Sequence, residues 1–566
     1  MPGPHLYPGV YVEEVPSGVR PIAGATTSDT AFVDWFPRGA TDRAVRVTSW
    51  ADFEREFGGL DANSEASYAI QQYYLNGGRV AWVVRVSAEA VVASRILSST
   101  QVYGAPPGPA VANILEVEAA SPGAWGNAVQ VAIDTHGVPT VGGTPTGFNL
   151  AVREVAQVGP KRVVTASESY LNLSVDATSA RFAPAVVNRN SRLVRLAYNG
   201  GGALPAVTGA DVVGDPARAR WLILGQNGFQ EGQAVSPAPT EWGTVTFEAG
   251  DDGTTPDEDD WRDSAGAAAL IGGEDAANAG IRELERIAPA TFNLLCLPAT
   301  AQLTPNSARS VLAEAASLCE DKRAFLLVDI PPDVDTVADM VEWVSGDDKP
   351  QTDHAAVYFP RLQVPDPLRD NELRSVGPSG TLAGVYSRTD AERGVWKAPA
   401  GIEAALRNAT VPVKLTDLEN GALNPLGANV LRSFPVYGTV AWGARTLEGS
   451  DQQASEWKYV PVRRTALFIE ESLSQGLKWV VFEPNDEPLW AQVRLNVGAF
   501  MQGLFRQGAF AGTTPREAYL VRCDSETTTQ ADVDLGIVNL IVGFAPLKPA
   551  EFVIIKLQQL AGQVQV

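Results

Sequence analysis

The sequence has little of what an enzyme or a metalloprotein usually needs. Its 566 residues include only 3 histidines and 3 cysteines. Cys296, Cys319 and Cys523 stand too far apart for a paired-cysteine metal site, and each lies in an apolar pattern that predicts a buried, reduced thiol. The HExxH pattern of zinc proteases and the Gly-Lys pair of a phosphate-binding loop are both absent. We therefore expect no catalytic site, no cofactor and no metal.

Positive charge is also scarce. The chain has 44 Lys and Arg against 66 Asp and Glu, a net charge of −22, which opposes binding to phosphate backbones or anionic lipid. The first residues, MPGPHLYPGV, lack the basic region and apolar run of a signal peptide, and no run of about 18 apolar residues occurs. We expect synthesis in the cytoplasm without a signal peptide, no nucleic acid partner and no membrane insertion.

One set of residues suggests an enzyme. Asp329 ends a predicted strand, His354 begins the next and Ser379 follows in GPSGT, which is the chain order of subtilisin-type proteases. A nucleophilic serine opens a helix from a fixed turn beside an oxyanion hole, whereas Ser379 lies in a Pro-Gly loop. Capping of the following helix explains Ser379 better, so an α/β serine hydrolase is kept only as an alternative.

Residues 26–96 and 271–429 alternate between strand and helix patterns. Ser49, with Asp52 three residues on, predicts one helix start, and the helix pattern SEASYAIQQYYLN stops at Gly77. The strand patterns are apolar throughout, which is typical of a parallel sheet covered on both faces. We predict a doubly wound α/β domain from these two segments.

The composition changes in residues 97–270. Gly, Pro, Thr and Val predominate in short alternating segments, so we predict an inserted, mostly β domain. Its acidic run at 251–263 lacks the ligand spacing of a calcium loop, and we interpret it as a solvated loop. Residues 430–550 have mixed patterns that predict a C-terminal α+β domain.

Both ends of the chain carry strand-like segments bounded by prolines. Residues 1–25 include YPGVYVEEVP, and residues 551–566 include EFVIIKLQQL, which is apolar on both faces. Pro546 and Pro549 separate the second segment from the domain before it. A strand of this kind at a free end either pairs within its own chain or invites association with another chain.

The longest predicted helix begins near Pro488 and has two unlike faces. The face predicted to be buried carries Leu489, Val493, Val497, Phe500, Met501 and Leu504. The opposite face is small or polar and includes Gln502 and Arg506, with Arg494 at its edge. This second face is therefore available to a partner.

Six segments of the chain are recognisable when taken together: YPGVYVEEVPSG, HAAVYFPRL, GPSGTLAGVYSRTDAERGVWKAPAG, SFPVYGTVAWGARTL, EWKYVPVRRTALFIEESLSQGLKWVVFEPNDEPLW and VRCDSETTTQADVDLGIVNLIVGFAPLKPAEFVIIKL. They resemble the sheath proteins of contractile phage tails and of phage-tail-like contractile injection systems. The resemblance covers residues 1 to about 90 and about 290 to 566. It leaves most of 97–270 unmatched, as expected of a variable outer domain.

The resemblance implies a structural protein with an α/β portion of subtilisin-like fold, which accounts for the order of Asp329, His354 and Ser379 without proteolysis. Many copies would form stacked rings or a helical sheath around an inner tube protein, with baseplate and tail-terminator or cap proteins at the ends. This extended, metastable part of a phage tail or injection particle would contract and drive the tube through a target envelope. A static filament or surface-layer protein is the structural alternative.

The resemblance also implies roles for the two arms and the long helix. In the family the arms add strands to the sheets of neighbouring subunits. The matching residues are Tyr7, Val10, Tyr11, Val12 and Val15 at one end, and Phe552, Val553, Ile554, Ile555 and Leu557 at the other. Residues 430–550 would form the tube-facing domain, with Arg494, Gln502 and Arg506 as its candidate contacts.

Overall fold

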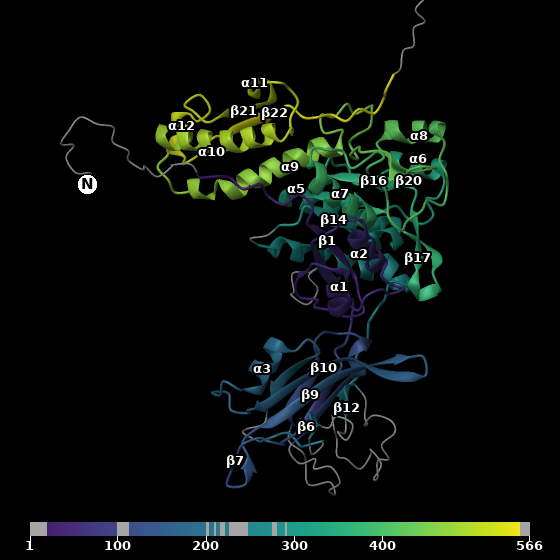
Figure 1. Cartoon of the computed structure of the whole chain (residues 1–566), viewed down its shortest axis with the longest axis vertical. Helices are drawn as coiled ribbons and strands as arrows, with labels where there is room; N and C mark the ends of the chain where they lie inside the picture. Colours follow the sequence, from purple (N-terminus) through teal and green to yellow (C-terminus); the bar gives the residue numbers. More distant parts are fainter. Residues whose placement is uncertain are drawn as a thin grey trace, which may run out of the picture. The chain divides into compact units, whose positions relative to one another are not determined.

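The chain divides into two compact units. Figure 1 labels their helices and strands. Unit 1 combines Met1–Thr27, Thr389–Pro399 and Glu456–Val566, and unit 2 combines Ser28–Arg388 and Ala400–Ser455. The computed structural model describes residues 20–98, 113–199, 203–208, 211–214, 221–225, 247–273, 280–288 and 291–554. In these stretches, no helix is both long enough and apolar enough to cross a bilayer.

Unit 2 is built on an eight-stranded sheet. Its strands, in order across the sheet, are β2 (Val45–Val47), β3 (Ala81–Val86), β1 (Thr30–Trp35), β14 (Leu294–Cys296), β15 (Phe325–Val328), β16 (Ala355–Phe359), β19 (Asn429–Phe434) and β20 (Gly438–Ala441). The strands from β3 to β19 pair in parallel, and β2 and β20 are antiparallel edges. This doubly covered parallel centre agrees with the predicted α/β pattern.

Two helices of unit 2 begin and end at the residues that the sequence predicts. The side chain of Ser49 accepts a hydrogen bond from the backbone N–H of Asp52 at the start of α1 (Trp50–Phe57). α2 (Glu65–Asn76) ends at Gly77, whose φ is 118°. The other helices between residues 260 and 430 are α4 (Gly266–Ile271), α5 (Pro305–Lys322), α6 (Val337–Ser345), α7 (Ser379–Arg393) and α8 (Asp417–Leu423).

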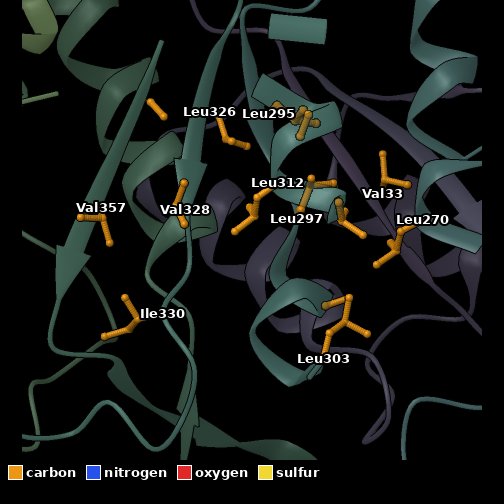
Figure 2. Packing of buried hydrophobic residues seen from close by; sticks show 14 of the residues in the cluster. Val33, Leu270, Leu295, Leu297, Leu303, Leu312, Leu326, Val328, Ile330 and Val357 are labelled. Carbon is orange, nitrogen blue, oxygen red and sulfur yellow. The ribbon is translucent and has the colours of Figure 1, made fainter. Parts of the chain in front are cut away.

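The core of the sheet is aliphatic. Leu295, Leu326 and Val357 come from three adjacent strands and lie in one buried cluster with Leu312 of α5 (Figure 2). Each side chain of this kind stabilises the fold by roughly 1.5–3 kcal/mol when fully buried. Cys319 belongs to the same cluster, and its burial raises the pKa of its thiol. The interpretation of Cys319 as a buried, free cysteine is confirmed.

α7 approaches α2 so closely that the two backbones touch. A Cβ atom at Gly380 would lie 2.2 Å from the carbonyl oxygen of Ala69, and one at Gly384 would lie 2.5 Å from that of Tyr73. Real Cβ atoms do not approach backbone atoms to these distances. Glycine is therefore required at both positions of the helix.

The insertion consists of two four-stranded sheets around a core of its own. One has the order β10 (Lys161–Leu173), β9 (Phe148–Val158), β6 (Val129–Asp134) and β12 (Leu222–Ile223). The other has the order β11 (Val194–Tyr198), β5 (Asn113–Ala119), β4 (Ser94–Ser98) and β13 (Phe247–Glu248). A short hairpin, β7 (Thr140–Val141) and β8 (Thr144–Pro145), and α3 (Ala183–Asn190) complete the described part, which is mostly β as its composition predicts.

The predicted limits of the insertion, 97 and 270, need correction. Ala93 already lies in the core of the insertion. At the other end, Trp261 is fully buried in the core of the eight-stranded sheet, together with Leu270. Residues 261–270 therefore belong to the α/β core, a placement that the acidic residues around Trp261 conceal in the sequence.

Unit 1 packs two long helices against a small sheet. α9 (Val460–Gly476) and α10 (Glu487–Arg506) share a buried cluster with the antiparallel strands β21 (Tyr519–Arg522) and β22 (Ile541–Phe544). Two short helices, α11 (Pro515–Ala518) and α12 (Gln530–Asp534), lie between these elements in the chain. The face of α10 predicted to be buried is confirmed, except that Phe500 is only partly buried.

The start of the C-terminal domain also differs from the prediction at residue 430. β19 and β20 occupy one end of the eight-stranded sheet, so residues 430–455 belong to unit 2. The sequence pattern missed this because a strand that joins a distant sheet has the same local alternation as one that opens a new domain. The C-terminal segment of unit 1 begins at Glu456.

A buried ion pair joins separate stretches of the chain within unit 1. The guanidinium of Arg464 on α9 binds both carboxylate oxygens of Asp390, at 3.0 and 2.6 Å, and each side chain is 3% exposed. A third hydrogen bond, 2.8 Å long, runs from Nη2 of Arg464 to the carbonyl oxygen of Thr27. Arg464 therefore links stretches of chain that are far apart in sequence.

We predict that Asp390→Asn destabilises unit 1 by about 3–5 kcal/mol, because it leaves the guanidinium of Arg464 buried without its counter-charge. Urea unfolding of the monomer measures this loss. The matched control is Glu487→Gln, which removes an exposed ion pair with Arg494 in the same unit and is expected to cost about 1 kcal/mol or less. Equal losses in the two variants would contradict the assigned role of Asp390.

Candidate functional site

Of Asp329, His354 and Ser379, the three residues that suggested a protease, Asp329 and Ser379 are hydrogen-bonded to each other. Asp329 follows β15, and its carboxylate accepts hydrogen bonds from the hydroxyl of Ser379 and, at 2.9 Å, from the Ser379 backbone N–H. Ser379 is the first residue of α7. Its hydroxyl therefore does not cap the helix, and that interpretation from the sequence was wrong.

The direct bond from Ser379 to Asp329 is not that of a catalytic triad. In a triad the serine donates to the imidazole, and the carboxylate orients the imidazole. Here the hydroxyl of Ser379 donates its hydrogen bond directly to the carboxylate of Asp329. Nδ1 of His354 lies 2.7 Å from the carboxylate of its neighbour Asp353. These contacts give Asp329, His354 and Ser379 structural roles.

Burial has a clear effect on Asp329. The pKa of its carboxyl is raised to about 6, mainly by loss of contact with water; the hydrogen bonds from Ser379 oppose this rise, and the negative charge of Glu65 contributes to it. A proton on Asp329 is therefore held more tightly in the folded chain than on an exposed aspartate.

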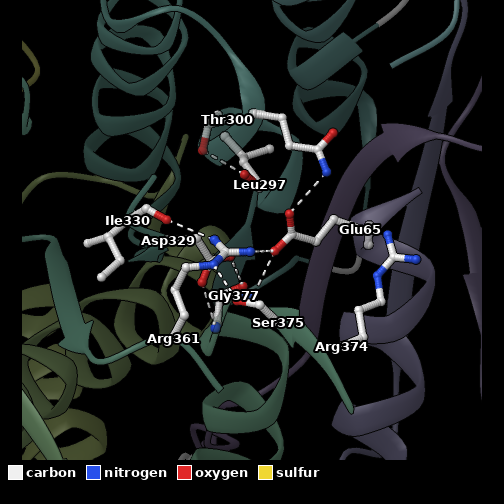
Figure 3. Close-up of polar contacts among 12 residues, drawn as sticks. Glu65, Leu297, Thr300, Asp329, Ile330, Arg361, Arg374, Ser375 and Gly377 are labelled. Atoms are coloured by element: carbon white, nitrogen blue, oxygen red, sulfur yellow. Dashed lines mark hydrogen bonds and ion pairs between the residues drawn. The ribbon is translucent and has the colours of Figure 1, made fainter. Parts of the chain in front are cut away.

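The same end of the sheet carries a buried ion pair between Glu65 and Arg361 (Figure 3). Their side chains are 3% and 6% exposed. Glu65 also accepts a 2.6 Å hydrogen bond from the N–H of Gly377, and Arg361 donates a 2.8 Å bond to the carbonyl oxygen of Ile330. The network joins α2 to the loops that follow β15 and β16, and so fixes the carboxyl ends of these strands.

A cavity of about 850 Å³ opens beside this network. It is lined by Asp329, by Trp343 of α6 and by several other carboxylates, among them Asp257 of the acidic run. In the part of the chain that the structure describes, no group of three or more His, Cys, Asp or Glu side chains is arranged to hold a metal ion. The interpretation of 251–263 as a solvated loop is wrong at its C-terminal end, where residues 259–263 are helical and Trp261 is buried.

The candidate tube contacts lie on α10, and two of them are engaged within unit 1. Arg494 binds Glu487 at 2.6 Å through Nη2 and donates to the carbonyl oxygen of Cys523 through Nη1. Gln502 accepts a 2.8 Å hydrogen bond from the hydroxyl of Tyr519. Arg506, in the last turn of α10, has an exposed side chain.

The described part of the C-terminal arm is apolar and uncovered. Phe552, Val553 and Ile554 are 76%, 82% and 82% exposed, and they form no strand with the rest of the described chain. The other predicted arm residues, Tyr7, Val10, Tyr11, Val12, Val15, Ile555 and Leu557, lie outside the described residues.

The small sheet of unit 1 has room for further strands. Among the described residues β21 and β22 have only each other as hydrogen-bonded neighbours, so each strand has an unpaired edge. One face packs in the core through residues such as Val521 and Val542, and the other leaves Leu520 and Ile541 about half exposed. An edge of this kind accepts an added strand.

Sequence reasoning missed one surface feature of unit 1. Val481 and Phe482 lie between α9 and α10 and are exposed, although both are large and apolar. The only signal in the sequence is the apolar run Trp479 to Phe482, which ends at Glu-Pro-Asn-Asp instead of continuing into a helix. A segment buried in the core would have the same apolar run, so the sequence does not distinguish exposed from buried residues here.

Comparison with known proteins points to one family. Residues 452–559 match the model of the phage tail sheath C-terminal domain. The chain is 27% identical over 292 residues to a prophage major tail sheath protein of Pseudomonas aeruginosa (strain UCBPP-PA14), and the alignment covers 51% of this chain and 71% of the relative.

Two solved structures are similar in fold along nearly the whole chain. The PVC sheath complex of an extracellular contractile injection system, in the contracted state, is 20% identical with a TM-score of 0.53, and the match covers 98% of each chain. The helical sheath of the anti-feeding prophage, also contracted, is 22% identical with a TM-score of 0.52, over 98% of this chain and 99% of that one. Residues 452–559 are therefore similar to the C-terminal domain of phage tail sheaths, and the relative and both solved structures that the chain resembles in sequence or in mixed α/β fold are sheath proteins.

Proposed function

We propose that the chain polymerises around an inner tube in an extended, metastable state and contracts to drive the tube through a target envelope. The main support for this proposal is that the fold, along nearly the whole chain, is similar to that of two sheaths in the contracted state. The assembled object is a phage tail or a contractile injection particle. Its other components are the tube protein, a baseplate and a tail-terminator or cap protein.

The energy for contraction comes, in this proposal, from the interfaces between copies. A lattice that buries more surface when contracted than when extended is a two-state system, and a baseplate at one end holds it in the less stable state. Each subunit keeps its fold during this change. We also propose that the α/β part is of the subtilisin-like type, in which Asp329 and Ser379 pair for structure.

Strand exchange between neighbours keeps the lattice connected while subunits slide. The exposed arm residues 552–554 and the unpaired edges of β21 and β22 support this part of the proposal. Each backbone hydrogen bond of an added strand contributes roughly 0.5–1.5 kcal/mol net. Burial of Phe552 and Ile554 adds roughly 1.5–3 kcal/mol each, before ordering costs. The N-terminal arm, residues 1–25, is proposed to act in the same way.

The exposed face of α10 is proposed to face the tube. Its residues between the buried positions are mainly small or polar, and Arg506 is an exposed charge at its end. Arg494 and Gln502 belong to the same proposed surface, but their side chains also hold α10 to neighbouring residues of unit 1. Arg506 is therefore the position at which tube contact is tested most cleanly.

The first prediction concerns the assembled object. Electron microscopy of particles from the native producer is expected to reveal two helical lattices of this protein, one longer and narrower and one shorter and wider. The reason is that a contractile sheath has two packings of the same subunit. A single lattice under all conditions would support a static filament instead.

The second prediction concerns the C-terminal arm. Deletion of residues 551–566 is expected to leave a soluble, folded monomer that forms no sheath, because the arm serves the neighbour and not its own unit. A matched full-length variant replaces Phe552, Val553 and Ile554 by serine and is expected to lose assembly as well. Circular dichroism and electron microscopy measure the two properties. Loss of folding in either variant would show that the arm pairs within its own chain.

The third prediction concerns the tube. Arg506→Glu is expected to reduce the number of sheath-covered tubes at least tenfold while the melting temperature of the monomer stays the same, because the side chain is exposed and its charge is reversed. The control is Arg189→Glu, an equally drastic change on the exposed side of α3. Normal particles from the Arg506 variant would remove Arg506 from the tube-facing surface.

A further inference from the structure

The turn between α9 and α10 carries an aromatic side chain in an unusual setting. Phe482 is fully exposed, and its backbone has a φ of 71°. A bulky residue rarely adopts this left-handed conformation, because its Cβ then crowds the backbone. Val481 beside it is 62% exposed. A strained backbone of this kind is found mostly at functional sites.

The turn is held rigidly, so the exposure of Phe482 is built into the fold. The N–H of Glu483 donates to the carbonyl oxygen of Val480 at 3.1 Å. The side chain of Asn485 donates to the carbonyl oxygen of Ile537 at 2.9 Å and accepts from the indole N–H of Trp490 at 2.8 Å. A rigid loop loses little conformational freedom when a partner binds to it.

The bond from Asn485 to Ile537 joins this turn to a second exposed apolar segment. Leu535 and Ile537 are 75% and 43% exposed. We call Val481, Phe482, Leu535 and Ile537 the Phe482 patch. Exposed apolar groups centred on one aromatic side chain are typical of protein interfaces.

The side chains around the patch are mainly acidic. Glu483, Asp486 and Asp534 are exposed beside it, and Lys478 is the exposed basic residue nearest to it in the turn. A fitting partner therefore presents an apolar segment with a positive charge nearby.

The chain itself contains such a segment. Residues 552–554 are apolar and exposed, and the sequence around them has two lysines, Lys548 and Lys556, against one acidic residue, Glu551. Glu551 accepts a hydrogen bond from the hydroxyl of Tyr459, whereas Lys548 is exposed. They belong to the same unit as the Phe482 patch, and both surfaces are exposed among the described residues. Because every copy carries both surfaces, pairing between copies repeats head to tail and builds a ring or an open polymer.

We propose that the Phe482 patch of one subunit binds residues 552–554 of a second copy, with Phe482 as the central side chain of the contact. This inference rests on the proposed function and adds to it. Strand exchange alone requires only a free backbone edge, whereas this contact requires one particular side chain on the receiving subunit.

Disulfide trapping tests the contact in particles from the native producer. The double variant Phe482→Cys with Ile554→Cys is expected to form a ladder of covalent oligomers under oxidising conditions, and reductant should return it to monomer. The native cysteines are all buried, so background cross-linking is low. The control is Val436→Cys with Ile554→Cys, in which an equally exposed valine of unit 2 replaces the receiving position and no ladder is expected.

A second variant keeps the ring at position 482. Phe482→benzoylphenylalanine is expected to cross-link, under ultraviolet light, to a peptide that contains residues 552–554 of another copy, as mass spectrometry of isotope-mixed particles identifies. A cross-link within one chain, or none in assembled sheath, would overturn the inference.

The substitution Phe482→Ser separates this contact from the proposed function. It is expected to lower the yield of sheath at least tenfold with an unchanged melting temperature of the monomer, and Val436→Ser is expected to leave the yield unchanged. If Phe482→Ser assembles normally while the deletion of 551–566 does not, strand exchange stands and the Phe482 contact is wrong. If both variants assemble normally, the proposed exchange of the C-terminal arm fails as well.

Discussion

In unit 1 a single guanidinium joins all three stretches of the chain. The chain of unit 1 is interrupted twice by unit 2, and Arg464 bonds to each of its three stretches: it lies on α9, it pairs with Asp390 and it donates to the carbonyl oxygen of Thr27. A planar group with several fixed N–H donors can make such bonds at once, which a lysine cannot. This bonding allows a domain made of distant segments to close around one core, and it fixes the point from which the N-terminal segment leaves that core.

Unit 2 has a parallel α/β sheet of the kind found in many enzymes, but its polar side chains are not arranged as a catalytic site. In parallel α/β sheets, catalytic and ligand-binding groups gather at the carboxyl ends of the strands. Here that edge carries Asp329, Ser379, Glu65 and Arg361. Their hydrogen bonds are made to one another, to backbone groups and to the side chains of Gln302 and Ser375. The same buried polar groups that position a substrate in a hydrolase therefore hold loops and helix ends in a structural subunit.

Local features of this fold could be predicted from the sequence, and long-range ones could not. The cap at Ser49, the helix end at Gly77 and the buried face of α10 depend on neighbouring residues, and all are as predicted. The burial of Trp261 and the place of β19 and β20 in the large sheet depend on contacts with distant segments.

The functional surfaces show the same division. The apolar character of residues 552–554 is written in the sequence, but their exposure is not. Arg494 and Arg506 look alike on a helical projection, but only Arg494 makes hydrogen bonds to Glu487 and Cys523. The left-handed backbone of Phe482 has no sequence signature, because positive φ is expected of glycine or asparagine and not of phenylalanine.

The contact between α2 and α7 has a mechanical consequence. Most helix pairs are separated by side chains that can change rotamer, and this layer yields under load. At Gly380 and Gly384 that layer is missing, so backbone presses on backbone. A seam of this kind is stiff in compression, and a force applied to one helix passes to the other with little loss of displacement. A subunit in a lattice that shortens therefore behaves along this seam as a solid link and not as a spring.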